Sequence, residues 1–69
     1  MLTIKFHMKS GQTLTHTIGV SEGTTLQESA DALQANFLKL DTINAKDHLT
    51  GEHFIIRFDD VSALTIRMF

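Results

Sequence analysis

Residues 2–18, "LTIKFHMKSGQTLTHTI", decide the fold, because apolar and polar side chains alternate on both sides of a Ser-Gly step. Alternation with a period of two is typical of a half-buried β-strand, so residues 1–8 and residues 12–20 each predict one strand. Gly11 stands where a three-residue hairpin loop needs a residue in the left-handed conformation. These residues therefore predict an antiparallel β-hairpin.

The register of this hairpin sorts its side chains onto two faces. Leu2 is expected opposite Ile18, and Phe6 opposite Leu14, so the even-numbered face is apolar. His16 also lies on that face, and we expect it to be hydrogen bonded at the margin of the core; the alternative is a pH-sensitive element. The odd-numbered face is polar and consists of Thr3, Lys5, His7, Thr13, Thr15 and Thr17.

A helix is predicted after the hairpin, within "SEGTTLQESADALQANFLKL" (residues 21–40). Thr25 and Glu28 have the spacing of a capping box, which places the start of the helix. Apolar residues then recur at spacings of four and three in a single stripe: Leu26, Ala30, Leu33, Phe37 and Leu40. The stripe should cover the apolar face of the hairpin. The end of the helix stays open, because Ile43 could extend the stripe.

The rest of the chain predicts less regular structure followed by two strands. Residues 41–52, "DTINAKDHLTGE", have no clear period and indicate a loop with room for one short strand. Residues 53–69, "HFIIRFDDVSALTIRMF", predict two strands on either side of Asp59 and Asp60. Their apolar faces consist of Phe54, Ile56 and Phe58 on one strand and Leu64, Ile66 and Met68 on the other.

This order of elements predicts a single α+β domain over residues 1–69. One helix would pack on one face of a four-stranded mixed sheet, and every apolar strand face would be available to it. A right-handed crossover places the last strand beside the first and parallel to it, which gives the spatial order 2-1-4-3 when strands are numbered along the chain. The arrangement is β-grasp-like, ββαββ.

"LTIKFHMKSGQTLTHTI" followed by "EGTTLQESADAL" resembles the first hairpin and helix of ubiquitin-like domains, and equally of the small immunoglobulin-binding domains of the protein L and protein G type. The resemblance implies the β-grasp fold. It transfers no functional residue, because the shared motifs are general hairpin and helix signals. Ubiquitin and the related sulfur carriers act through a C-terminal Gly-Gly tail, whereas this sequence finishes with Arg67, Met68 and Phe69. Conjugation and sulfur transfer are therefore not expected.

Composition argues against several classes of function. The 69 residues include no cysteine, so neither a disulfide framework nor a thiolate metal site is expected. The start of the chain lacks the features of a signal peptide and no long apolar run is present, so we expect a cytoplasmic protein without membrane contact. A formal net charge of −2 favours no class of partner.

No motif predicts catalysis, a metal or a cofactor. The serines lack the context of a nucleophile elbow, and the four glycines are scattered, so no phosphate-binding loop is present. His48, Glu52 and His53 lie close together, but their spacing matches no defined zinc motif. We therefore expect a protein that is not an enzyme.

Two sets of residues are candidates for contact with a partner. Basic side chains collect on the outward sheet face, where no acidic residue is expected: Lys5, His7, His53, Arg57 and Arg67. Apolar side chains left outside the predicted core are Leu38, Ile55 and Phe69. Residues 12–20 and 53–58 would also form open sheet edges, to which another chain can pair.

These features predict a small non-enzymatic protein–protein interaction module, of the kind found among bacterial and phage accessory proteins. It would bind a protein of unknown identity through a sheet edge or face. Two alternatives stay open. The basic face could bind a nucleic acid or another anion, although no aromatic side chain occupies its strand positions. The chain could instead form a homodimer or an assembly subunit.

Overall fold

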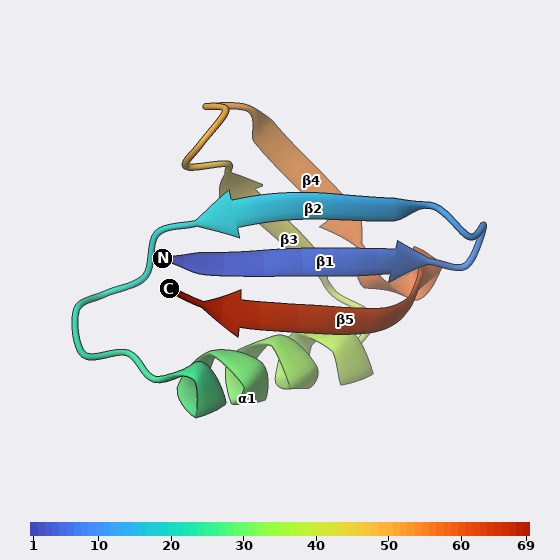
Figure 1. Cartoon of the computed structure of the whole chain (residues 1–69). Helices are drawn as coiled ribbons and strands as arrows, with labels where there is room; N and C mark the ends of the chain where they lie inside the picture. Colours follow the sequence, from blue (N-terminus) through green and yellow to red (C-terminus); the bar gives the residue numbers. More distant parts are fainter.

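Two β-sheets and one helix make up the protein in the computed structural model, which describes residues 1–69 (Figure 1). Strands β2, β1 and β5 form one sheet, and β3 and β4 form the other. The elements are β1 (Leu2–Met8), β2 (Thr13–Ile18), α1 (Leu26–Leu38), β3 (Thr42–Lys46), β4 (His53–Arg57), a 3₁₀ turn η1 (Phe58–Asp60) and β5 (Val61–Met68).

The β1–β2 hairpin forms in the predicted register. Leu2 pairs with Ile18, and Phe6 pairs with Leu14. The N–H of Met8 donates to the Gln12 carbonyl at 2.8 Å, which closes the three-residue loop. Gly11 has a φ of +94°, the left-handed conformation that the loop requires. The prediction of hairpin, register and turn is confirmed.

Helix α1 begins where the capping box predicts. The Thr25 hydroxyl accepts the N–H of Glu28 at 3.1 Å and donates to the Glu28 carboxylate at 3.2 Å. The helix ends at Leu38, so Ile43 does not extend it. Leu40 adopts a φ of +54°, and the N–H of Asp41 reaches back to the Asn36 carbonyl at 3.1 Å. The helix therefore terminates in a left-handed cap built on a leucine.

Replacing Leu40 with glycine is expected to stabilise the fold by up to about 1 kcal/mol. Glycine relieves the cost of the left-handed conformation, about 1–2 kcal/mol for an L-residue, and this gain exceeds the entropy that a glycine loses. Little packing is lost, because the Leu40 side chain is 62% exposed. Urea denaturation measures the change. Leu38→Gly, at the last helical residue, is the matched control and should destabilise by about 1 kcal/mol.

The small α+β class is confirmed and is compatible with a β-grasp-like fold, but the single four-stranded mixed sheet is not. The last strand does lie beside the first, yet β5 is antiparallel to β1, with Thr3 opposite Arg67 and Lys5 opposite Thr65. Residues 42–46 form β3, which pairs antiparallel with β4 in a separate sheet. The predicted order had no strand at the position of β3. Because β3 reverses the chain direction once more, the last strand, β5, runs antiparallel to β1 instead of parallel.

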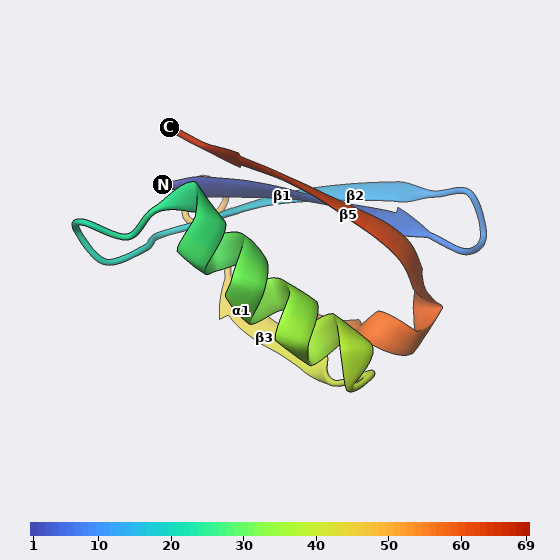
Figure 2. The same cartoon turned by 90° about the horizontal axis from the view of Figure 1, so that it is seen from below.

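The core lies between two layers. The β2-β1-β5 sheet forms one layer, and α1 together with the β3–β4 hairpin forms the other (Figure 2). The buried hydrophobic residues are Leu2, Ile4, Phe6, Leu33, Phe54, Ile56, Phe58 and Val61. Leu33 is the only one of these that α1 supplies. The helix thus covers only part of the sheet, and the β3–β4 hairpin covers the rest, where the sequence predicted the helix alone.

Candidate functional site

The outward face of the β2-β1-β5 sheet has two exposed cations, Lys5 on β1 and Arg67 on β5. Because Arg67 is opposite Thr3 and Lys5 is opposite Thr65, the two cations are diagonal neighbours across adjacent strands. They border a hollow of about 420 Å³. Its lining consists of Thr3, Lys5, Thr65, Ile66, Arg67 and Phe69.

Neither cation is neutralised within the protein. Arg57 forms an ion pair with Asp59, and His16 contacts Asp47, but neither Lys5 nor Arg67 has a carboxylate within ion-pair distance. Strands β1, β2 and β5 contain no aspartate or glutamate. No side chain of these three strands therefore supplies a counter-charge to the two cations at the hollow.

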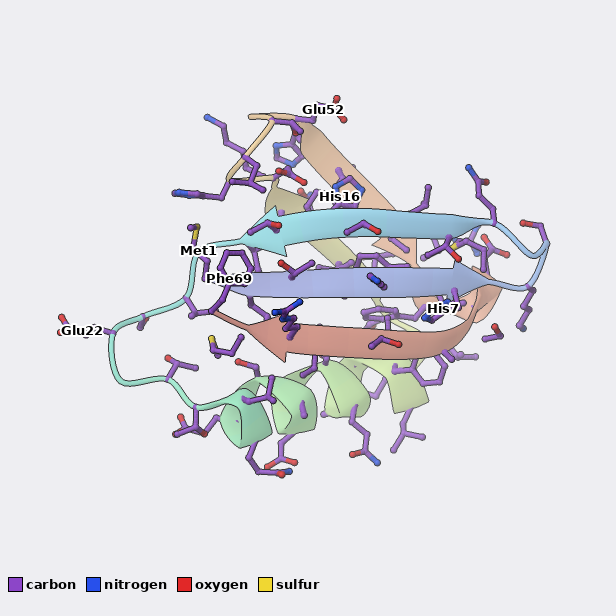
Figure 3. All side chains as sticks on the ribbon, viewed as in Figure 1. Met1, His7, His16, Glu22, Glu52 and Phe69 are labelled. Atoms are coloured by element: carbon purple, nitrogen blue, oxygen red, sulfur yellow. The ribbon has the colours of Figure 1, made fainter.

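His7 shares this face but is engaged by its neighbours. Its Nε2 lies 2.9 Å from the Thr65 hydroxyl, and its Nδ1 lies 3.5 Å from the Thr13 hydroxyl. The imidazole thus bridges β2 and β5 across β1 at the end of the strand away from Phe69 (Figure 3). No carboxylate orients the ring, so the Thr65–His7 contact lacks the third member of a catalytic triad.

His53 and Arg57 lie on a different surface, so the prediction that they share the outward sheet face with Lys5 and Arg67 is wrong. Both belong to β4, whose Phe54 and Ile56 point into the core and whose alternate side chains are exposed. The β3–β4 hairpin crosses behind the three-stranded sheet (Figure 1). His53 contacts the Asn44 side chain, and the Arg57 guanidinium pairs with Asp59 at 2.8 Å. Two separate sheets divide the predicted face.

The three apolar candidates are all exposed but lie apart. Leu38 is 72% exposed at the end of α1, and Ile55 is 64% exposed on the outer side of β4. Phe69 is 60% exposed and borders the basic hollow. Its N–H donates to the Met1 carbonyl at 2.9 Å, which holds Phe69 beside the start of β1 (Figure 3). Phe69 thus adjoins Lys5 and Arg67, whereas Ile55 lies between His53 and Arg57 on the exposed face of β4.

Sequence reasoning missed the most highly connected polar residue, Asp47. Its Oδ1 accepts the N–H groups of Leu49 and Thr50 at 2.9 and 3.0 Å. Its Oδ2 accepts the N–H of Thr17 at 3.2 Å and faces Nδ1 of His16 at 3.0 Å. These contacts join the β3–β4 loop to β2. Asp47 followed by Thr50 and Gly51 is an Asx-turn pattern that could have indicated the residue.

Hydrogen bonding depresses the pKa of the Asp47 carboxyl group well below its ordinary value. The backbone N–H of Thr50 has the largest effect, and the His16 side chain and the N–H of Thr17 add to it against the opposing effect of burial. His16 stacks on Phe54 with ring centroids 4.0 Å apart. The expectation of a hydrogen-bonded histidine at the core margin is confirmed, and this pair stabilises the fold.

Open backbone groups occur along the outer edge of β5. On β2, the N–H of Thr17 donates to Asp47 and its carbonyl accepts from His48, so the backbone groups of Thr17 point away from β1. Because the direction of these groups alternates along a strand, the even-numbered residues of β2 are the ones that bond to β1. Odd-numbered β1 residues must then bond to β5, as the Phe69–Met1 contact shows. The backbone groups of Leu64, Ile66 and Met68 therefore point away from the sheet, at an edge that the sequence did not predict.

No three His, Asp or Glu side chains are grouped so that they could hold a metal ion. The structure has no helix with the length and apolar character needed to cross a membrane. Comparison with protein-family models, curated proteins and solved structures finds no match to this chain.

Proposed function

We propose that this protein is a non-enzymatic protein-binding module that receives an acidic segment of its partner on the outward face of the β2-β1-β5 sheet. The observation that supports the proposal most directly is the pair of unneutralised cations, Lys5 and Arg67, beside the hollow. A guanidinium group binds a carboxylate through charge-assisted, often bidentate, hydrogen bonds. Charge complementarity of this kind selects partners and speeds association.

The same cations would also attract a nucleic acid, but the face offers few places for bases to stack. Phe69 is the only aromatic residue that lines the hollow, and proteins that bind single strands usually stack successive bases on several rings. The rest of the sheet face consists of threonines, Ala63 and His7, and the His7 ring is held by the hydroxyl groups of Thr65 and Thr13. This difference favours an acidic protein segment over a single-stranded nucleic acid.

Reversing both charges is expected to abolish binding of an acidic peptide. Fluorescence anisotropy with a labelled glutamate-rich peptide at low salt would show at least about a tenfold weakening in Lys5→Glu/Arg67→Glu. The matched control is Lys39→Glu/Lys46→Glu, which makes the same change in net charge at exposed positions outside this sheet. It should change the affinity by no more than about twofold, because screening limits its effect at a distance.

Two results would contradict the proposal. Equal losses in the two double variants would mean that net charge, and not this face, controls binding. Tighter, face-dependent binding of a labelled single-stranded oligonucleotide would support the nucleic-acid alternative instead. A lysine-rich peptide serves as the reference for nonspecific contact.

A further inference from the structure

A second hollow lies at the open edge of β5. It has a volume of about 240 Å³ and lies between α1 and β5. The helix contributes Ala30, Leu33, Gln34 and Phe37, and the strand contributes Ser62, Ala63, Leu64 and Ile66. Six of these eight residues are hydrophobic. A chain lying along β5 would therefore have an apolar floor beneath it.

The hollow wraps around the edge of the strand. Leu64 belongs to the face that packs toward the core, whereas the exposed Ala63 belongs to the outward face. Both line the same hollow. The unpaired N–H and carbonyl groups of Leu64 and Ile66 lie along this edge, so the groove offers backbone pairing and apolar contact together.

The opposite edge of the sheet is less open. On β2 the N–H of Thr17 donates to Asp47, and its carbonyl accepts the N–H of His48 at 2.6 Å. Only Thr13 and Thr15 leave outward-pointing backbone groups on that strand, and neither adjoins the apolar groove. Of the two edges, β5 is the better place for another strand.

We propose that an extended segment of the partner protein adds to the edge of β5 as a further strand. This inference rests on the proposed function and specifies how the acidic partner binds. Side chains alternate along a strand, so one set would enter the groove against Ala30 and Phe37 and should be apolar. The other set would lie on the outward face beside Arg67, whose charge is unneutralised, and should be acidic.

Charge and backbone together select this occupant. A helix cannot pair with the free N–H and carbonyl groups of Leu64 and Ile66, whereas an extended segment can. A uniformly apolar strand would fill the groove but leave Arg67 without a counter-charge. The predicted ligand is therefore a short segment in which apolar and acidic residues alternate.

The test uses a peptide of about six residues in which valine and glutamate alternate, together with a copy that is N-methylated where its backbone would face β5. We expect the methylated copy to bind at least about tenfold more weakly, because it cannot donate to the strand. In the complex, the amide protons of Leu64 and Ile66 should exchange at least about tenfold more slowly. Those of Thr13 and Thr15 should be unaffected.

A variant of the groove provides an independent check. Ala30→Phe fills the hollow and should weaken binding of the valine–glutamate peptide by at least about tenfold, whereas Ala35→Phe, at an exposed helix position, should not. If Ala30→Phe fails to fold, the methylated peptide and the amide exchange still decide the question.

Equal binding of the methylated peptide, with unchanged exchange at Leu64 and Ile66, would overturn the strand addition. The proposed function would survive that result if the glutamate-rich peptide still lost affinity in Lys5→Glu/Arg67→Glu. Concentration-dependent protection of Leu64 and Ile66 without any peptide would show that a second copy of the chain occupies the edge, and would also overturn this inference.

Discussion

Phe58→Ala is expected to unfold most of the protein. Phe58 is completely buried in the 3₁₀ turn that leads from β4 to β5, and its ring meets that of Phe37 edge-on with centroids 5.9 Å apart. Truncating a buried phenylalanine costs about 3–5 kcal/mol. A chain of this length has a total stability of about 3–10 kcal/mol, so the loss removes much or all of it. Circular dichroism with urea denaturation measures it.

Phe69→Ala is the matched control for this change. The same side chain is removed from a position that is 60% exposed, so the free energy of unfolding should change by no more than about 0.5 kcal/mol. A wild-type urea midpoint for Phe58→Ala would show that the buried Phe58 ring does not contribute the expected stability.

Acid is expected to destabilise the protein through Asp47. The pKa of this carboxyl group is depressed in the folded state, and its ordinary value is 3.8. Above that pH the group is ionised in both states, and the stabilisation from its hydrogen bonds is complete. As the pH falls below it, the unfolded chain takes up a proton that the folded protein does not, so stability is lost progressively. Thermal unfolding followed across this pH range measures the loss.

Asp47→Asn should reduce the stability at neutral pH and make it less dependent on acid. The carboxylate accepts hydrogen bonds at both oxygens, but an amide has only one acceptor. Whichever way the amide is turned, its NH₂ group faces a backbone N–H that the carboxylate accepted. This is either the N–H of Thr17 or the N–H groups of Leu49 and Thr50. We expect the unfolding temperature to fall by roughly 10 °C or more.

Asp60→Asn serves as the control, since Asp60 is exposed and its side chain makes no hydrogen bond within the protein. Its unfolding temperature should stay close to the wild-type value at neutral pH. The role assigned to Asp47 would be wrong if the two variants showed the same pH profile.

Local patterns predicted the local structure well. The alternation on both sides of Gly11 specifies strand, turn and register together, because a slip of one residue would expose Leu2 and Phe6. The capping box at Thr25 likewise places the start of α1. Both the strand alternation and the capping box depend on residues close together in the chain, so the sequence alone is enough to predict the structures they specify.

The pairing of distant strands was not readable in this way. Residues 42–46 do alternate between polar and apolar, but the run is only five residues long and its two apolar residues are Ile43 and the small Ala45. The strand depends on the packing of these two side chains against the core, which a short local pattern does not indicate. Asp59 and Asp60 resemble a hairpin loop, but they belong to a 3₁₀ turn that passes the chain from one sheet to the other. The direction of β5 depended on both features.

The candidate site was predicted only where it lies on adjacent strands. Lys5 and Arg67 share a face because β1 and β5 are adjacent strands, as the sequence predicted. Their adjacency is enough whether β5 runs parallel or antiparallel to β1. Arg57 could share that face only if β4 belonged to the same sheet as β1 and β5, but β4 pairs with β3 in a separate sheet. Asp47 acts on groups far away in the chain, such as the Thr17 N–H, and no local pattern announces such a contact.

The central position of β1 affects the order of events during synthesis. One neighbour, β2, follows at once, but the other comes from the far end of the domain, as the His7–Thr65 contact across 58 positions shows. An isolated two-stranded hairpin is marginal in water. The three-stranded sheet can therefore form only after Met68 has left the ribosome, and closing so long a loop should make folding slow for a chain of this size.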